Sequence, residues 1–288
     1  MTIFVVGAAG FIGAQLIEAA RKAGPAVGMS RSAAAPSLTL DLEHSELFDY
    51  GRIQPSDTVL LTAAISSPDI CAREHARAWA TNVSGTSVFI ERVMARGGRV
   101  IFFSSDTVYG DQNRVFDEAA PCKPAGEYAE MKYAVEQRFL GNPLFKVVRL
   151  SYVFSRVDKF TGYLADCAAR GEEADIFHPF YRAVIHRQDV IDGVLALAQR
   201  WDEFSGGVFN FGGPAALART EFAHSLQQLA LPGLRYRVTE PGAEFFKNRP
   251  REIRMVSPIL PLLLKRPART LCEAIEFEFN EDKENQHV

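Results

Sequence analysis

The sequence Ile3-Phe-Val-Val-Gly-Ala-Ala-Gly10-Phe-Ile-Gly13 decides the fold. The apolar run at residues 3–6 is typical of a short buried strand, and residues 14–22 have the composition of a helix. Glycines let the backbone pass close to a bound group, and free N–H groups at a helix start attract negative charge. The stretch therefore predicts a strand, a tight turn and a helix that bind a dinucleotide through Gly7, Gly10, Phe11, Ile12 and Gly13. A glycine-rich turn without a ligand is the alternative.

Composition narrows the class of protein. The chain has 288 residues, 47% of them hydrophobic, and a formal charge of -3. A small negative net charge provides no broad positively charged surface, so nucleic acid is not expected as a principal partner. No apolar run approaches a membrane span and no signal segment is apparent, so a cytoplasmic protein is expected. The cysteines are far apart without a CxxC pair, which argues against a disulfide framework and a zinc site, and no metal is expected; they are Cys71, Cys122, Cys167 and Cys272.

Apolar runs alternate with helical stretches through the first half of the chain. Strands are expected at residues 3–6, 26–30, 58–62, 99–103 and 146–150, and helices at 14–22, 72–96 and 129–139. This alternation predicts an α/β fold with a Rossmann-like, doubly wound parallel sheet. We expect residues 1–155 to form an NAD(P)-binding domain to which 183–200 return. Residues 156–288 would form a smaller C-terminal substrate-binding lobe, with a frayed tail at 280–288.

Tyr128 and Lys132 form a candidate catalytic pair. Four residues apart, they lie on one face of the expected helix. A cation held near a phenol lowers its pKa, which would let Tyr128 act as an acid or base. The strand at 99–103 leads into Ser104, Ser105 and Asp106, so hydroxyls are expected where a strand's carboxyl end meets the cleft. A surface tyrosine and lysine on an ordinary amphipathic helix are the alternative.

Several motifs occur together and in a fixed order. They are Gly7/Gly10/Gly13, Asn82-Val-Ser-Gly-Thr86, Ser105 with Val108-Tyr-Gly110, and Tyr128/Lys132. In this combination the chain resembles the extended short-chain dehydrogenase/reductases, the NAD-dependent epimerase/dehydratase family. Further matches include Asp41-Leu42, Leu61-Thr-Ala63-Ala64 and His186-Arg-Gln-Asp189. The resemblance covers nearly the whole chain.

The resemblance implies roles for individual residues. Ser105 would bind the substrate oxygen, with Asp106 as a further substrate contact, and Tyr128 would be the acid/base. Lys132 would bind the nicotinamide ribose and tune the tyrosine. Asn82 would sustain a water relay to the lysine, unless its amide bonds locally. The remaining implied cofactor contacts are Asp41, Leu42, Ala63 and Ala64; Asp41 would reach the adenine amine, with a turn or cap as the alternative. Asp189 is expected to cap the helix at 190–198.

The end of the second strand bears on the choice of cofactor. NAD binding normally uses a carboxylate there, whereas this chain has Ser30-Arg31-Ser32. A hydroxyl and a guanidinium suit a 2′-phosphate, because the planar guanidinium group can donate two parallel hydrogen bonds to the phosphate oxygens. NADP(H) is therefore predicted as the preferred cofactor, and NAD(H) is the alternative. The alternative for Arg31 is an exposed loop arginine that binds no cofactor.

One position and three short motifs bear on the reaction. Dehydratase relatives carry a glutamate where this chain has Thr107, which disfavours dehydration. Three motifs resemble those of the dTDP-4-dehydrorhamnose reductases: Met29-Ser-Arg-Ser32, the segment 207–214 followed by Arg219-Thr-Glu-Phe222, and Arg249-Pro-Arg251. The resemblance implies NADPH-dependent reduction of a 4-keto group on a nucleotide sugar, with Arg251 or Arg249 on the diphosphate or else solvated. An NAD-dependent nucleotide-sugar epimerase and a non-catalytic NADP-binding sensor are the alternatives, and a homodimer through residues 72–96 and 129–139 would suit the family.

Overall fold

A seven-stranded parallel sheet forms the centre of the protein in a computed structural model that describes residues 1–32 and 37–284. The strand order is β12-β7-β5-β4-β1-β2-β3. The inner strands β1, β4 and β7 are buried along their whole length, as expected for a sheet covered on both faces. The predicted α/β doubly wound class is confirmed. The seven strands are β1 Ile3–Val6, β2 Ala26–Ser30, β3 Leu38–Thr39, β4 Thr58–Leu61, β5 Arg99–Ser105, β7 Phe145–Leu150 and β12 Val208–Phe211.

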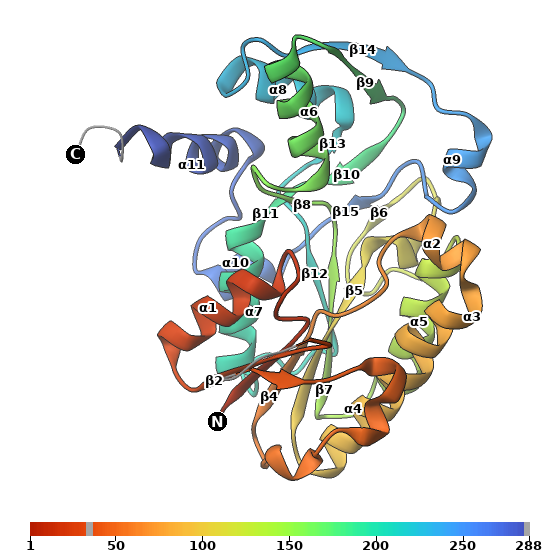
Figure 1. Cartoon of the computed structure of the whole chain (residues 1–288), viewed down its shortest axis with the longest axis vertical. Coiled ribbons are helices and arrows are strands. Elements are labelled where there is room, and N and C mark those ends of the chain that lie inside the picture. Colours follow the sequence, from red (N-terminus) through yellow and green to blue (C-terminus); the bar gives the residue numbers. More distant parts are fainter. Residues whose placement is uncertain (33–36, 285–288) are drawn as a thin grey trace.

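Helices cover the sheet on both faces (Figure 1). On one face, α1 (Gly13–Ala23), α7 (Arg187–Gln199) and α10 (Leu260–Leu264) pack in a shared apolar cluster with β1 and β5. On the other, α4 (Thr86–Ala95) and α5 (Glu127–Phe139) pack against the opposite side chains of the same strands. The alternation of side chains along each strand supplies these two layers.

A smaller lobe is built from short elements with a core of its own around Phe154, Leu164, Phe222 and Ile275. Its helices are α6 Lys159–Arg170, α8 Arg219–Leu229 and α11 Leu271–Glu284, and its strand pairs are β9 Glu173–Phe177 with β14 Arg235–Thr239 and β10 Tyr181–Ala183 with β13 Ala216–Ala218. Other short elements are α2 Pro68–Arg73, α3 His75–Trp79, α9 Ala243–Lys247, β6 Val115–Phe116, β8 Val153–Phe154, β11 Ile185–His186, β15 Arg254–Met255, and the 3-10 turns η1 Leu42–Leu47, η2 Tyr50–Arg52 and η4 Asp106–Tyr109.

The chain returns from the lobe to the sheet. After β10 it forms α7 on the sheet and then β12, which pairs in parallel with β7. The sequence suggested such a return for residues 183–200, whereas β12, at 208–211, was not expected. The tail expected to fray at 280–288 is helical as far as Glu284 in α11, and residues 285–288 lie outside the described residues.

The single helix predicted at residues 72–96 is wrong. The segment is divided into α2, α3, a π-helical turn η3 (Ala80–Gly85) and α4, with a break at Glu74. A Cβ on Gly85 would lie 1.7 Å from the backbone oxygen of Leu42, so η3 approaches η1 too closely for any other residue. The periodic apolar pattern continues through these breaks, which explains why it indicates one helix.

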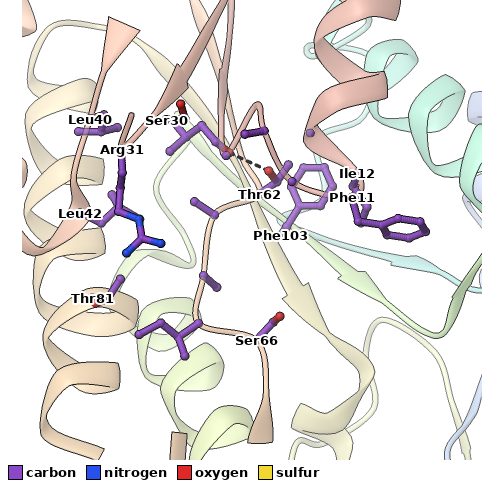
Figure 2. A pocket seen from close by; sticks show the side chains of 18 of the residues that line it. Phe11, Ile12, Ser30, Arg31, Leu40, Leu42, Thr62, Ser66, Thr81 and Phe103 are labelled. Carbon is purple, nitrogen blue, oxygen red and sulfur yellow. Dashed lines mark hydrogen bonds between the residues drawn. The ribbon is translucent and has the colours of Figure 1, made fainter. Parts of the chain in front are cut away.

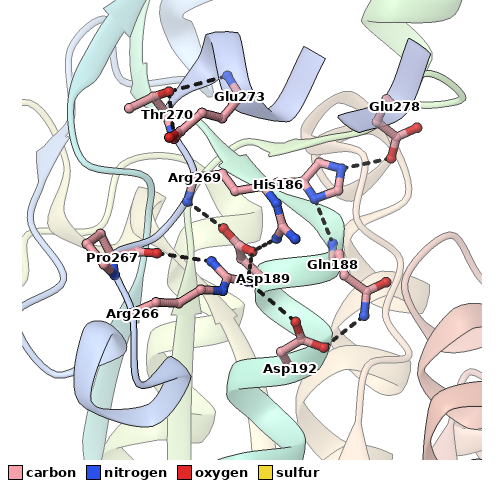
Figure 3. A network of polar contacts seen from close by, with 10 residues as sticks. All are labelled: His186, Gln188, Asp189, Asp192, Arg266, Pro267, Arg269, Thr270, Glu273 and Glu278. Atoms are coloured by element: carbon pink, nitrogen blue, oxygen red, sulfur yellow. Dashed lines mark hydrogen bonds and ion pairs between the residues drawn. The ribbon is translucent and has the colours of Figure 1, made fainter. Parts of the chain in front are cut away.

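Asp189 does not cap a helix, because α7 begins two residues before it. The cap residue is His186, whose imidazole accepts from the backbone N–H of Gln188. The fully buried Asp189 carboxylate instead accepts from the Arg266 guanidinium at 2.7 Å and the Arg269 backbone N–H at 2.7 Å, and it also pairs with the Arg269 guanidinium (Figure 3). Asp189 thus fixes the segment that leads into α11.

Two further findings concern the described residues as a whole. None of their helices combines the length and apolarity needed to cross a bilayer. No group of three or more histidine, cysteine, aspartate or glutamate side chains among them is arranged to hold a metal ion. All four cysteines have free thiols.

Candidate active site

A cavity of about 530 Å³ lies at the carboxyl ends of β1, β2, β4 and β5. Ligands of open parallel sheets bind at this edge. The cavity volume falls in the range of small-molecule and cofactor sites, about 300–1,000 Å³. Every cofactor contact expected from the sequence lines it, namely Gly7, Gly10, Phe11, Ile12, Gly13, Ser30, Arg31, Asp41, Leu42, Ala63, Ala64, Tyr128 and Lys132.

The glycine turn shapes one end of the cavity. Gly7 has φ +90°, and its backbone N–H donates to Met29 at 2.9 Å. A Cβ on Gly13 would lie 2.1 Å from the Gly7 oxygen, so the turn and the helix start pack without room for a side chain. No side chain caps α1 and no acidic residue lies in its first turn. Its first N–H groups thus suit a diphosphate.

The opposite end of the cavity is lined by polar side chains. Figure 2 shows the Arg31 guanidinium extending from the end of β2 toward Leu42 and Thr81. Asp41 caps η1, because its carboxylate accepts from the Glu43 backbone N–H at 3.0 Å. The cap reading of Asp41 is therefore confirmed, although the residue also lines the cavity.

Tyr128 and Lys132 both line the cavity from α5. The Lys132 ammonium is buried, donates to the Phe103 carbonyl at 2.8 Å, and lies 5.8 Å from the centre of the Tyr128 ring. Burial lowers the pKa of Lys132 to about 8. Burial, reinforced by Cys71 and Asp106, raises the pKa of Tyr128 well above its usual value. The expected lowering of the Tyr128 pKa by Lys132 is wrong for this arrangement, because desolvation of the phenol dominates.

The serines at the end of β5 have different surroundings. Ser105 does not line the cavity; its Oγ caps η4, accepting from the Thr107 backbone at 3.2 Å and hydroxyl at 2.9 Å. Ser104 lines the cavity, and its buried Oγ has no hydrogen-bond partner among the described residues. The sequence analysis gave Ser104 no role. Its alternation with Ser105 along the strand was the available signal, since neighbouring strand residues face opposite sides.

Asp106 is a buried carboxyl between the sheet and the lobe. It accepts from the Ser151 hydroxyl at 2.7 Å and from Ser105 at 3.3 Å, and it lies 3.7 Å from the Arg182 guanidinium. Burial raises its pKa, while Arg182 and then Ser151 act in the opposite direction. Asp106 therefore links the turn that holds Ser105 to an arginine of β10.

Asn82 uses both ends of its amide locally. The side-chain oxygen accepts from the Ile65 backbone N–H at 2.8 Å, and the nitrogen donates to the Ile65 carbonyl at 2.9 Å. The residue lies in the π turn η3 and ties it to the loop after β4. This geometry is the local-bonding alternative to the water relay.

The arginines expected on the substrate diphosphate are already engaged. Arg251 lies 3.7 Å from the Glu240 carboxylate with its guanidinium 4.1 Å from the centre of the Phe246 ring. Arg249 bonds the Asp69 carboxylate of α2 at 2.8 and 2.6 Å. Neither lines the cavity. The sequence analysis gave no binding role to Arg182 or Arg219 of the lobe, although Arg219 begins one of the motifs that carry the resemblance.

Comparison with known proteins agrees with this geometry. The model of the family described as "NAD dependent epimerase/dehydratase family" matches residues 3–212. The chain belongs to this family. It is an NAD(P)-dependent enzyme of the extended short-chain dehydrogenase/reductase type, as the sequence motifs indicated. The narrower likeness to the rhamnose-pathway reductases stays a prediction.

Individual relatives are more distant. The chain is 24% identical over 240 residues to a probable low-salt glycan biosynthesis reductase of Haloferax volcanii, covering 78% of this chain and 79% of that protein. A UDP-glucose 4-epimerase from Thermotoga maritima, solved with UDP-glucose, has a TM-score of 0.84 at 22% identity over 99% of this chain and 100% of its own. MoeE5, solved with UDP-glucuronic acid and NAD, has a TM-score of 0.81 at 23% identity with the same coverage. These structures support the fold.

Proposed function

We propose that this protein uses NADPH to reduce a 4-keto group on a nucleotide-activated sugar. The observation that carries the proposal is the convergence in one cavity of the glycine turn, Arg31 and the Tyr128–Lys132 pair. The relative named as a glycan biosynthesis reductase supports reduction. The names of the structural neighbours, with UDP-glucose or UDP-glucuronic acid bound, support a nucleotide sugar as substrate.

The cofactor would lie along the cavity with its diphosphate at the start of α1. Ser30 and Arg31 would bind the 2′-phosphate, and Lys132 the nicotinamide ribose. When bound, the reduced nicotinamide supplies a hydride to the substrate carbonyl carbon. The Tyr128 phenol, whose raised pKa keeps it protonated at neutral pH, would give its proton to the oxygen as negative charge develops there. Ser104, whose unpaired hydroxyl lines the cavity, would bond that oxygen, whereas the Ser105 hydroxyl expected for this role is held at the cap of η4.

Epimerisation is the second candidate, because several neighbouring structures are named as 4-epimerases and contain NAD. The two reactions differ in what is consumed. A reductase oxidises one NADPH for each sugar, whereas an epimerase inverts a centre with no net change in the nicotinamide.

The deciding experiment incubates the purified chain with NADPH or NADH and a panel of nucleotide-linked 4-keto sugars. We expect stoichiometric oxidation of NADPH, measured by the loss of its nicotinamide absorbance, and reduction of the sugar, measured by mass spectrometry. Inversion without net oxidation would favour the epimerase. Oxidation of neither nucleotide, with no change in any sugar, would favour the sensor.

Cofactor choice is tested by Arg31→Ala. Because a charge-assisted bond to a phosphate contributes about 1.5–3 kcal/mol, NADPH affinity should fall about ten- to a hundredfold. NADH affinity, lacking the 2′-phosphate, should change little. Arg21→Ala, an exposed arginine of α1, is the matched control. Equal losses for the two nucleotides would refute the 2′-phosphate assignment.

A further inference from the structure

Arginines of the lobe gather beside a second, smaller pocket, and two of them are already paired. Arg182 of β10 donates to the Pro250 carbonyl at 2.8 Å and the Tyr181 carbonyl at 2.6 Å, and it lies 3.7 Å from the Asp106 carboxylate. Arg249 is held by Asp69. Both guanidinium groups therefore have their charge balanced within the protein.

Arg219, the first residue of α8, is different. Its guanidinium carbon lies 4.3 Å from the centre of the Phe160 ring and 4.6 Å from that of Phe180. Among the residues whose side chains the structure describes, no oxygen accepts a hydrogen bond from this guanidinium and no carboxylate forms an ion pair with it. Burial lowers the pKa of Arg219 to about 10, so the group is still charged at neutral pH. A desolvated cation held by two rings is positioned for an anion.

The pocket in front of Arg219 adjoins the active site. Tyr152 and Arg182 line it together with Arg219. Tyr152 follows two residues after Leu150, which lines the cofactor cavity, and Arg182 contacts Asp106, next to Ser105. Asp106 is also an electrostatic neighbour of Tyr128, so a ligand held at Tyr128 can extend past Arg182 toward Arg219.

Size and charge define what fits there. The free space is about 20 Å³, and a water molecule needs roughly 10–15 Å³. The pocket thus admits the oxygen edge of a group and not a sugar ring. The nearby Asp158 carboxylate is occupied by the Tyr152 hydroxyl, by Thr161 and by the N-terminal amides of α6. Asp158 therefore makes no direct contact that would compensate the positive charge of Arg219.

We infer that Arg219 binds an oxyanion of the substrate, either a phosphate of the nucleotide diphosphate or a carboxylate on the sugar. The inference rests on the proposed function in taking the ligand to be a nucleotide sugar. The planar fork would bond two oxygens of the group, while Phe160 and Phe180 hold its plane. Arg219 is then the substrate-binding arginine of this chain in place of Arg249 and Arg251.

The test is calorimetric titration of the full chain with its cofactor site saturated by NADP⁺ or NAD⁺, whichever binds more tightly. The probes are inorganic pyrophosphate, UDP, uridine and glucuronate. Arg219→Gln should weaken pyrophosphate and UDP at least about tenfold and leave uridine unchanged if the diphosphate is the ligand. Loss of glucuronate binding alone would identify the carboxylate. Arg237→Gln, an exposed lobe arginine paired with Asp175, is the matched control and should change nothing.

Unchanged affinity for every probe in Arg219→Gln, or equal losses in both variants, would overturn the inference. Arg219→Lys provides a second route if Arg219→Gln does not fold, since it keeps the charge and removes the fork. It should weaken the sensitive probe by severalfold, and wild-type affinity would again overturn the inference. No turnover is needed in these titrations, so a failure of the proposed reduction is distinguishable from a failure at Arg219.

Discussion

The sheet half and the lobe bury charge in opposite ways. In the sheet half, Arg149 of β7 and Glu136 of α5 form an ion pair at 2.6 Å with both side chains less than 5% exposed, and α5 also carries the candidate catalytic pair. In the lobe, Arg219 is surrounded by rings and lacks a carboxylate at contact distance. The protein thus pairs this buried arginine of the sheet half internally and leaves the arginine of the lobe for a ligand. Substitutions can test each side of this contrast.

The largest expected effect is on turnover. Tyr128→Phe removes the proposed proton donor, and general acid catalysis contributes about 10²–10⁴-fold, so kcat should fall by that factor. Cofactor affinity, measured by fluorescence titration, should stay within about twofold. Tyr133→Phe, on the same helix, is the matched control. Normal turnover in Tyr128→Phe would remove this residue from the chemistry.

The buried pair comes next. Glu136→Gln leaves the Arg149 charge buried without its partner, which costs about 3–5 kcal/mol of unfolding free energy. Denaturant unfolding followed by circular dichroism measures the change. Glu91→Gln breaks the exposed ion pair between Glu91 of α4 and Arg138 of α5. It should cost less than about 1 kcal/mol of unfolding free energy. Similar losses in the two variants would mean that burial does not set the strength of the pair.

Lys132 predicts a pH dependence. Its pKa is about 8 in the folded protein and 10.5 for the free side chain. Between these pH values only the unfolded chain keeps the proton, so the folded state gains stability as pH rises from about 8 to 10.5. Relative to Lys132→Met, the wild type should gain about 2–3 kcal/mol over this window. Exposed Lys123→Met is the control. A constant difference between wild type and Lys132→Met across the window would contradict the lowered pKa.

The smallest effect is expected where the two halves meet. Asp69 of α2 is 62% exposed and its partner Arg249 is 19% exposed. Asp69→Asn should change the unfolding free energy by less than about 1 kcal/mol. Because Arg249 lowers the pKa of Asp69, even this contribution disappears as pH falls through that lowered value. A loss of several kcal/mol would show that docking of the lobe depends on this one contact.

The cofactor half was largely predictable because its signals are local. Residues 3–13 specify a strand, a turn and a helix start, and the parallel sheet then brings Arg31 and Ala63 to the edge where Lys132 of α5 also lies. The boundaries of β1 and β2 agree with the expected ranges. Each of these depends on residue types within one short segment.

The misses depend on contacts between distant segments. The π turn within residues 72–96 packs Gly85 against the Leu42 backbone, which is a contact between distant segments. Only the partners Arg266 and Arg269, about 80 residues away, show that Asp189 anchors a later segment. The surroundings of the Arg219 guanidinium likewise consist of two distant residues, Phe160 and Phe180. All three have the same physical cause. Each depends on neighbours that lie far away in the sequence, and no periodic pattern in a single sequence indicates such neighbours.

The position of β12 has a practical consequence for anyone who divides this protein. Because Val208–Phe211 closes the side of β7 only after the chain has built much of the lobe, a fragment ending at residue 155 would leave β7 as an open edge with unpaired backbone groups. Such edges recruit other chains and aggregate. A soluble cofactor-binding fragment would need residues 185–211 grafted back onto it.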